Sequence, residues 1–256
     1  MCLIAFSYKT HPKYKLIVAT NRDEFYKRPT RPAQFWIDEG QPQLLAGKDL
    51  KANGTWIGIS KNGKWGALTN FRDLSNIHED APTRGTLVLD FLKSAEPANE
   101  YLQNLVGSTQ DYNGFNLLIG DTDKLYHYSN ESQQISEIEP GIHGVSNALL
   151  DTSWPKLDYA KRNLQHVLSG ETFEKEDLFQ ILKNPEKAAD DQLPSTGLSY
   201  ELEKAISPVF IKTENYGTLC STLLMIDYEG NAEFTERRYD SASSKVIEEN
   251  SFQLSF

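Results

Sequence analysis

Cys2 is the residue in this chain whose type and position most clearly suggest chemistry, because only Met1 precedes it. A small penultimate side chain usually permits removal of the initiator methionine, which would leave Cys2 with both a thiol and an α-amine. Such an amine titrates at about pH 7.7–8.0, so roughly a sixth of it is an uncharged base at neutral pH. A thiol beside that base is an activated nucleophile that needs no histidine. The alternative is a buried or incidental cysteine without a chemical role.

Two short runs at the start of the chain predict the hairpin that would position this thiol. CLIAFSY and YKLIVATN alternate as β-strands do, and the polar segment KTHPK separates them. In a hairpin, the end of the second strand lies beside the start of the first, which is where Cys2 stands. The residues that end the second strand are therefore expected next to the thiol.

Four polar residues end that second strand, namely Asn21, Arg22, Asp23 and Glu24. A carboxylate at this place can hold and orient the α-amine through a charge-assisted hydrogen bond. Because side chains alternate along a strand, Asn21 and Asp23 point to one face and the other two point to the opposite face. We expect one pair to face the nucleophile and the other to brace the adjacent loop. A solvated turn with internal salt bridges is the alternative.

Two later strands also end in an amide side chain, since GALTN ends at Asn70 and GVSN ends at Asn147. Asparagine N–H groups can stabilise the oxyanion that develops when a thiolate attacks a carbonyl carbon. Loss of one such donor costs about 100-fold or more in rate. The alternative use is an Asx turn, which is common after strands. The joint presence of both amides and an N-terminal cysteine favours the catalytic interpretation.

Further hairpins are expected along the rest of the chain. Asn62-Gly63 lies between TWIGIS and WGALTN, and this dipeptide is a strong hairpin signal. FNLLIG and KLYHYS are expected to turn through the segment that contains Thr122, and the last hairpin is expected to turn at Gly230. Strands linked in this way predict largely antiparallel sheets.

Helical spacing of apolar residues appears between these groups of strands. It predicts a helix over 88–95 that Thr83 could cap, a second over 157–168 that ends at Gly170, and a third over 174–184. Groups of strands interrupted by helices predict an α+β fold, in which helices cover the sheets.

Composition excludes several classes of protein. Hydrophobic residues make up 39% and charged residues 24% of the 256 residues, as in an ordinary globular protein, and the net charge of -10 argues against nucleic acid or anionic lipid as partners. No apolar run reaches 18 residues and the start lacks a basic region, so neither a membrane span nor a signal peptide is expected.

Two cysteines, Cys2 and Cys220, are too few for a disulfide framework, which favours the cytoplasm, although one bridge between them stays open. The five histidines lack metal-ligand spacing and Gly-rich phosphate loops are absent, so no metal and no cofactor is expected.

Several motifs, spread in order from residue 2 to about residue 237, together resemble one family. They are MC before an apolar strand, VATNRDEFYKRP, GTWIGIS, GALTNFRD, YNGFNLLIG, GVSNALLDTSWPK, and YGT followed by ST and ID. On these motifs the chain is identified as a member of the NRDE proteins, the family that includes the transport and Golgi organisation protein-two homologues. The resemblance implies one domain over 1–256 with an N-terminal nucleophile hydrolase fold. That fold is a four-layer αββα sandwich, similar in outline to the penicillin V acylase and bile salt hydrolase group.

The more distant resemblance to those amidases implies roles for single residues. The N-x-D pattern in TNRDEF resembles their strand end, which makes Asp23 the carboxylate that binds the α-amine. Their arginine just before the asparagine has no counterpart, because Thr20 stands there. Asn70 resembles their probable oxyanion donor, and Asn147 resembles the asparagine of a later strand end. Leu219 stands where NRDE proteins usually carry arginine after YGT, so an arginine contact to a substrate carboxylate or phosphate would be lost.

These roles imply a hydrolase that acts on a non-peptide C–N amide bond of a small molecule, with Cys2 as the nucleophile after removal of Met1. Asn21, Arg22 and Thr69 are expected to contact the substrate. The alternative is a non-catalytic protein of the same fold that binds and carries haem, acyl-CoA or lipid, to which NRDE proteins are linked. A structural interaction protein is a third alternative, against which the polar cluster at the strand ends argues.

Overall fold

The chain folds as two compact units that interleave in sequence. The computed structural model describes residues 2–121 and 123–256, so the predicted removal of Met1 and the predicted turn at Thr122 lie outside the described residues. The expectation of a single domain stays a prediction. The first unit comprises the chain up to Lys27, Pro140–Ser146 and Leu150–Gln253, and the second unit comprises Arg28–Glu139, Asn147–Leu149 and Leu254–Phe256.

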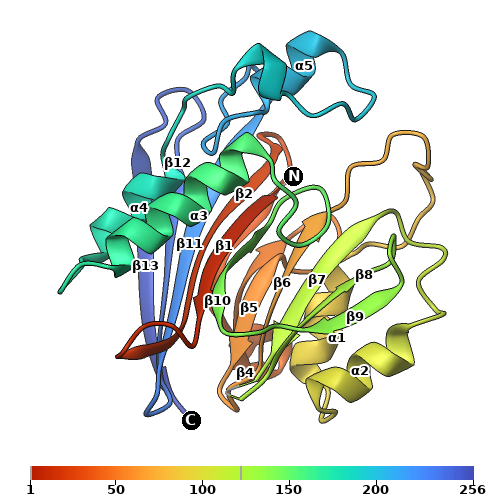
Figure 1. Cartoon of the computed structure of the whole chain (residues 1–256). Coiled ribbons are helices and arrows are strands. Elements are labelled where there is room, and N and C mark those ends of the chain that lie inside the picture. The colour runs from red at the N-terminus through yellow and green to blue at the C-terminus, as the bar shows by residue number, and fades with distance from the viewer. Residues whose placement is uncertain (1, 122) are drawn as a thin grey trace. The chain divides into compact units, whose positions relative to one another are not determined.

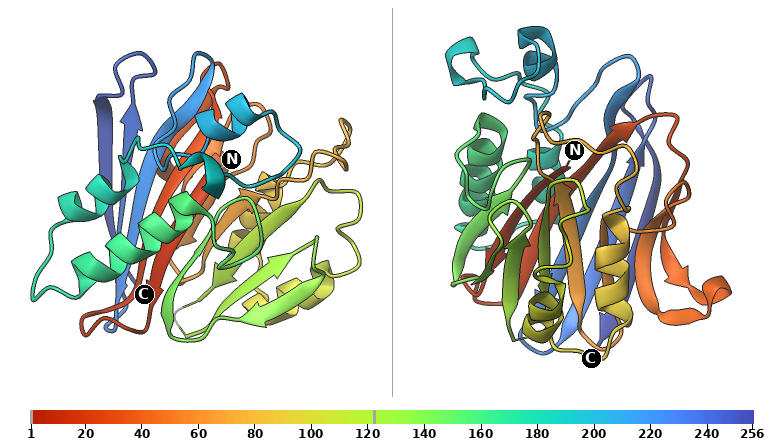
Figure 2. Two further views of the ribbon diagram at one scale, coloured as in Figure 1. Left: turned by 45° about the horizontal axis from the view of Figure 1, so that its top comes forward. Right: turned by 90° about the vertical axis from the view of Figure 1, so that its right-hand side faces the viewer.

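The first unit is built on a six-stranded sheet with the strand order β10-β1-β2-β11-β12-β13 (Figure 1). Strand β1 pairs antiparallel with both β10 and β2, and β11 pairs antiparallel with both β2 and β12. Helices α3 and α4 lie side by side along one face of this sheet, as Figure 2 also shows. The elements are β1 (Cys2–Tyr8), β2 (Tyr14–Phe25), β10 (Gly141–Val145), α3 (Pro155–Leu168), α4 (Lys175–Leu182), η2 (Asp190–Gln192), α5 (Tyr200–Ala205), β11 (Tyr216–Asp227), β12 (Asn231–Tyr239) and β13 (Val246–Ser255).

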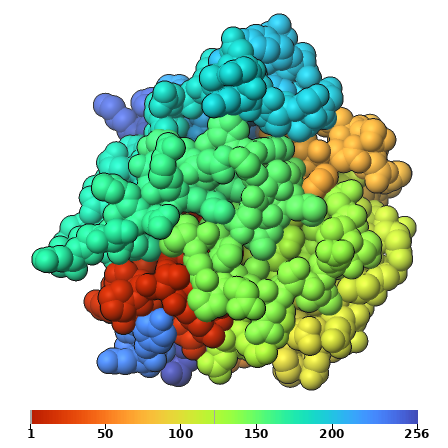
Figure 3. Space-filling model, in the orientation of Figure 1, coloured from red at the N-terminus to blue at the C-terminus, as the bar shows by residue number. Residues whose placement is uncertain are grey.

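Alternation along β1 and β2 decides which side chains lie beneath these helices. Leu3, Ala5, Ile17 and Ala19 are at most 1% exposed and share one apolar cluster with Leu157 of α3. In Figure 3 the side chains of α3 and α4 cover this part of the sheet, and the turn between β1 and β2, in red, emerges beneath them. The residues that alternate with these along β1 and β2, Cys2 among them, therefore project to the other face of the sheet.

Gly144 in β10 allows α3 to approach the sheet closely. A Cβ atom at this position would lie 2.5 Å from Cδ1 of Leu157 and 2.9 Å from the carbonyl oxygen of Ile4. We therefore expect Gly144→Ala to lower the free energy of unfolding by about 1–3 kcal/mol, measured by urea denaturation. Gly170→Ala is the control, because its nearest contact would be 3.3 Å away, and it should change stability by less than about 1 kcal/mol. Equal losses in both variants would contradict the packing argument.

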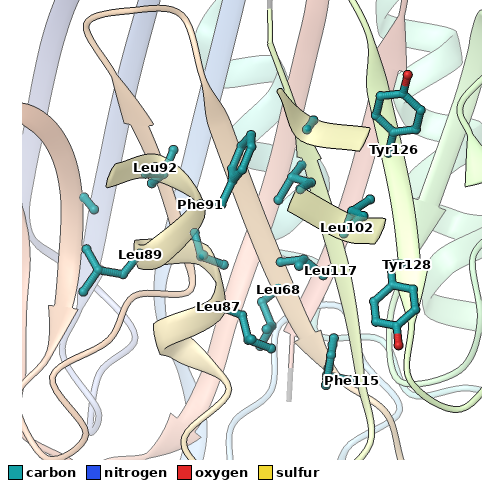
Figure 4. Packing of buried hydrophobic residues seen from close by; sticks show 14 of the residues in the cluster. Leu68, Leu87, Leu89, Phe91, Leu92, Leu102, Phe115, Leu117, Tyr126 and Tyr128 are labelled. Carbon is teal, nitrogen blue, oxygen red and sulfur yellow. The ribbon is translucent and has the colours of Figure 1, made fainter. Parts of the chain in front are cut away.

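The second unit carries a seven-stranded sheet in the order β3-β4-β5-β6-β7-β8-β9. Helices α1 and α2 pack on it through fully buried side chains such as Phe91 and Leu102, which meet Leu117 and Tyr128 of the sheet in one cluster (Figure 4). The elements are β3 (Thr30–Trp36), η1 (Ile37–Glu39), β4 (Gln41–Asp49), β5 (Ile57–Ser60), β6 (Trp65–Asn70), α1 (Gly85–Lys93), α2 (Ala98–Leu105), β7 (Phe115–Gly120), β8 (Leu125–Ser129) and β9 (Gln134–Glu137).

The hairpins predicted from alternation are confirmed. The pairs β1–β2, β5–β6, β7–β8 and β11–β12 are each antiparallel neighbours. Of the Asn62-Gly63 pair, Gly63 takes the left-handed conformation at φ 81°, and its N–H donates to the carbonyl of Ser60 at 3.0 Å. Strand β13 was not predicted. Most of its residues are exposed, and its sequence therefore lacks the regular alternation of apolar and polar residues that marks a half-buried strand.

The predicted helices are confirmed, but two of their ends are wrong. Helix α1 begins at Gly85 with Arg84 as the N-cap residue, and the backbone oxygen of Thr83 only accepts a hydrogen bond from Thr86. The C-cap of α3 is Ser169 rather than the following glycine. In the part of the chain that the structure describes, no helix combines the length and the apolar character needed to cross a membrane.

Candidate active site

Cys2, Arg22 and Cys220 form a row across three neighbouring strands at one end of the first unit's sheet. Arg22 of β2 is paired directly with Cys2 of β1 on one side and with Cys220 of β11 on the other. Directly paired residues project to the same face with Cβ atoms about 5 Å apart, so the guanidinium stem lies between the two thiols. The two cysteines are thus separated by two strand spacings, or about 10 Å, which is too far for a disulfide. Both are free, and the bridge that the sequence left open is not formed.

The environment of Cys2 keeps its thiol protonated at neutral pH. Burial raises the pKa of the Cys2 thiol and the charge of Asp23 acts in the same direction, whereas Arg22 and a hydrogen bond from the backbone N–H of Asp23 lower it. The pKa of Cys220 is raised well above its ordinary value, chiefly by burial and then by Glu236. Because the thiolate is the nucleophile, a base must deprotonate Cys2, and Cys220 is an inert buried thiol.

The carboxylate of Asp23 is held firmly near the end of β2, one residue beyond the residue that pairs with Cys2. Asp23 is 1% exposed, and the hydroxyl of Thr218 donates to its Oδ1 at 2.6 Å. The backbone N–H of Ile211 donates to the same hydroxyl oxygen at 3.0 Å, which directs the hydroxyl proton to the carboxylate. Burial raises the pKa of Asp23, while Lys156, Thr218 and Arg22 lower it. The side chain is therefore oriented by the hydrogen bond from Thr218, and the positive charges of Lys156 and Arg22 favour its ionised form.

A β-bulge in β11 brings Thr218 to Asp23. The register places Thr218 opposite Asp23 and Cys220 opposite Arg22, so Leu219 is the extra residue between them. A bulge sends the residues on either side of it to opposite faces, which alternation alone would not allow. Thr218 can thus meet the carboxylate on one face while Cys220 joins the row of thiols on the other. Leu219, which stands where NRDE proteins usually carry arginine, is thus the bulge residue itself.

Asn21 has a structural role, and its predicted contact with substrate stays a prediction. Its Nδ2 donates to the carbonyl oxygens of Leu182 at 2.8 Å and Val209 at 2.9 Å, and its Oδ1 accepts from the hydroxyl of Ser221 at 2.5 Å. The side chain is fully buried and both amide hydrogens are used. Asn21 therefore ties the end of α4 and the segment before β11 to the sheet.

The two asparagines predicted as oxyanion donors lie together in the second unit. Nδ2 of Asn147 donates to the backbone oxygen of Asn70 at 2.8 Å, and the backbone oxygen of Asn147 accepts from the N–H of Arg72. Asn147 thus fixes the backbone at Asn70, which is the more exposed of the two. Cys2 and Asp23 belong to the first unit, and a joint role of all four residues stays a prediction.

Thr69 lies in a buried polar network of the second unit rather than on its surface. Its hydroxyl oxygen accepts from Nδ2 of Asn116 at 3.2 Å, and Oδ1 of Asn116 lies 3.0 Å from Nε2 of His127. Asn116 also donates to the carbonyl of Ala148 at 2.9 Å, next to Asn147. Thr69 is fully buried and supports this network, and its predicted contact with substrate stays a prediction.

Two residues of the site escaped the sequence analysis. Thr218 stands in the YGT motif, but its contact with Asp23 depends on the bulge. Lys156 follows Pro155 at the start of α3, and only the fold reveals that it is buried. The motif DTSWPK did contain a signal, namely a lysine at a helix start, where a positive charge opposes the helix dipole.

Among the described residues, no group of three or more His, Cys, Asp or Glu side chains is arranged to hold a metal ion.

Comparison with known proteins places the chain among relatives of similar length. Residues 1–241 match the profile of the family described as Transport and Golgi organisation 2. The mouse Transport and Golgi organization 2 homolog is 34% identical and the match covers 99% of each chain. The Drosophila melanogaster Transport and Golgi organization protein 2 is 28% identical, over 92% of this chain and 91% of its own.

Two solved structures share the fold at low sequence identity. A Caenorhabditis elegans N-acylethanolamine-hydrolyzing acid amidase ortholog has a TM-score of 0.51 and 11% identity over 87% of this chain and 92% of its own. A mutant conjugated bile acid hydrolase from Clostridium perfringens has a TM-score of 0.52 and 9% identity over 98% and 96%. This likeness confirms the predicted α+β class and the fold of the N-terminal nucleophile hydrolases.

Proposed function

The chain belongs to the Transport and Golgi organisation 2 family, and from this premise we propose that it is an N-terminal nucleophile hydrolase that cleaves a C–N amide bond of a small molecule. One observation carries the proposal: the backbone N–H of Asp23 meets the sulfur of Cys2, and the Asp23 carboxylate is buried and oriented by Thr218. A buried carboxylate near the end of β2, next to the first residue of β1, suits the binding of an α-amine.

The proposed reaction requires that Met1 be removed. The α-amine of Cys2 then accepts the thiol proton, and the thiolate attacks the amide carbonyl carbon to form a tetrahedral intermediate. Collapse of that intermediate breaks the C–N bond, and the α-ammonium gives its proton to the departing nitrogen. Water hydrolyses the resulting thioester, with the amine accepting a water proton and returning it to sulfur. The raised pKa of the thiol makes this base necessary.

Three further side chains have proposed roles in the same reaction. Arg22 shares a face with the thiol and offers a positive charge to an acyl oxygen or to an anionic group of the substrate. Asn70 and Asn147 are proposed to stabilise the oxyanion, with Asn147 acting partly through the backbone of Asn70.

Intact-mass analysis with an acylating probe tests the proposal. The purified protein should lack Met1, and treatment with a β-lactone should add one acyl group, which peptide mapping locates on Cys2. The variant Cys220→Ser should react equally, since that thiol is buried. Protein that has lost Met1 and yet shows no adduct on Cys2 would count against a hydrolase.

As a second candidate we propose a non-catalytic carrier of haem, acyl-CoA or lipid on the same fold. The relatives are named for transport and Golgi organization and not for hydrolysis, which favours a role without catalysis. A haem titration followed at the Soret band distinguishes the two candidates. Saturable binding that survives in Cys2→Ala, without acylation of the wild-type protein, would favour the carrier.

A further inference from the structure

Lys156 is a buried lysine at the start of a helix, next to side chains of the apolar core. It is 4% exposed and follows Pro155, the first residue of α3. The next residue, Leu157, packs in the cluster that contains Leu3 of β1, and Gly144 allows this close approach. The helix is thus anchored beside the beginning of β1, and Lys156 is enclosed with it.

This position is unfavourable for a positive charge for two separate reasons. Removing an ammonium group from water is costly unless an opposite charge compensates it. The first turn of a helix also carries a partial positive charge, which repels a cation. The other charged residue of this turn, Asp158, is exposed and accepts from Ser153. A lysine in this place needs a buried carboxylate as its counter-ion.

Asp23 meets this requirement. Asp23 lies two residues after Asn21 in β2, so both side chains point to the same face of the sheet. The amide of Asn21 binds the end of α4, so this is the face that the helices cover. Lys156 is the strongest of the influences that favour the charged form of this carboxylate, ahead of the hydrogen bond from Thr218 and the charge of Arg22. Both side chains are buried in the first unit, Lys156 at 4% and Asp23 at 1% exposure, and α3 packs against β1, the strand that pairs with β2.

We propose that Lys156 is a positioning residue of the Cys2 site, whose enclosed ammonium keeps the Asp23 carboxylate charged and held at the start of β1. The inference rests on the proposed function for its catalytic consequence, but not for the electrostatic influence of Lys156 on Asp23. A carboxylate already compensated by Lys156 can orient the α-amine without holding it permanently as an ammonium. The amine of Cys2 can then act as the base.

The test is the pH profile of acylation of Cys2 by the β-lactone in Lys156→Met and Lys156→Arg. Loss of the cation should raise the pKa of Asp23 and that of the α-amine, so the acid limb of the profile moves to higher pH in Lys156→Met. The rate at pH 7 should fall by about tenfold or more, and Lys156→Arg should restore most of it. The groups around Asp23 that also titrate or carry charge are Cys2, Arg22 and Tyr26, and all are retained in these variants.

Lys161→Met is the matched control, because Lys161 is also a lysine of α3 but pairs with Asp151, and it should leave the profile unchanged. A lower rate in Lys156→Met with a profile of unchanged shape would overturn the proposal. If Lys156→Met does not fold, Lys156→Gln keeps a polar side chain of similar length and is held to the same expectation.

A titration that needs no activity separates this inference from the proposed function. In the Cys2→Ala background, carboxyl ¹³C NMR of labelled aspartate, with Asp23→Asn for assignment, should show Asp23 titrating at higher pH when Lys156 is methionine. That shift, together with no acylation of the protein that keeps Cys2, would support the role of Lys156 and count against the hydrolase. An unchanged titration of Asp23 would overturn the role of Lys156 whatever the activity.

Discussion

Replacement of Cys2 by alanine is expected to abolish formation of the acyl-enzyme and to reduce amide turnover by about 10⁴-fold or more, because the attacking sulfur is lost. Replacement by serine should leave a small residual rate, since the hydroxyl is a weaker nucleophile that still has the α-amine as its base. Both effects are measured as single-turnover rates with an activated acyl ester, and as adduct mass.

Cys220→Ser is the control for this prediction. Cys220 lies on the other side of Arg22 in the same row, but it is 2% exposed and its thiol pKa is well above the ordinary value. Its replacement should leave acylation within about twofold. Residual labelling of Cys2→Ala equal to that of the wild type would show that another group reacts, and it would remove the basis of the proposed mechanism.

Replacement of Asn21 by leucine is expected to lower the free energy of unfolding by roughly 3–5 kcal/mol. The substitution removes the donors to two buried carbonyl oxygens, those of Leu182 and Val209, and also the acceptor for the hydroxyl of Ser221. Each polar group left unsatisfied in the interior costs about 1–3 kcal/mol. Urea denaturation at neutral pH measures the change.

Asn104→Leu makes the same chemical change at an exposed site of α2, where the amide lies 3.4 Å from Glu96. It should alter stability by less than about 0.5 kcal/mol. A loss in Asn21→Leu no larger than that of this control would mean that Asn21 does not hold α4 and the segment at Val209 to the sheet.

Much of the fold could be predicted because apolar residues recur with one period in half-buried strands and with another in half-buried helices. The alternation of CLIAFSY and YKLIVATN predicts the hairpin β1–β2, and the spacing from Leu157 to Leu168 predicts α3. Strand β13 could not be predicted in this way, since it is largely exposed. The prediction that Thr83 caps α1 was wrong, since the N-cap residue is Arg84. A suitable residue type does not ensure that the N–H groups of the first helical turn lie within reach of its side chain.

The candidate site divides along similar lines. Alternation predicted that Arg22 faces away from Asn21 and Asp23, and the register confirms this by pairing Arg22 with Cys2. Alternation placed Asn21 and Asp23 on the same face, two residues apart, but it could not show which buried partners each side chain binds. Asn21 reaches carbonyls 161 and 188 residues further along the chain, whereas Asp23 meets Thr218 through a bulge.

The sequence by itself determined the cysteine at position 2, the hairpin that brings the end of β2 beside it, and the family, because residue type and short-range periodicity are local properties. The tertiary structure decided which buried partners Asn21 and Thr69 bind, and that the side chain of Lys156 is buried in the same unit as Asp23. Those assignments depend on burial and on partners distant in the chain. The cost of leaving a buried polar group or charge uncompensated, which selects these partners, arises only once the chain has folded.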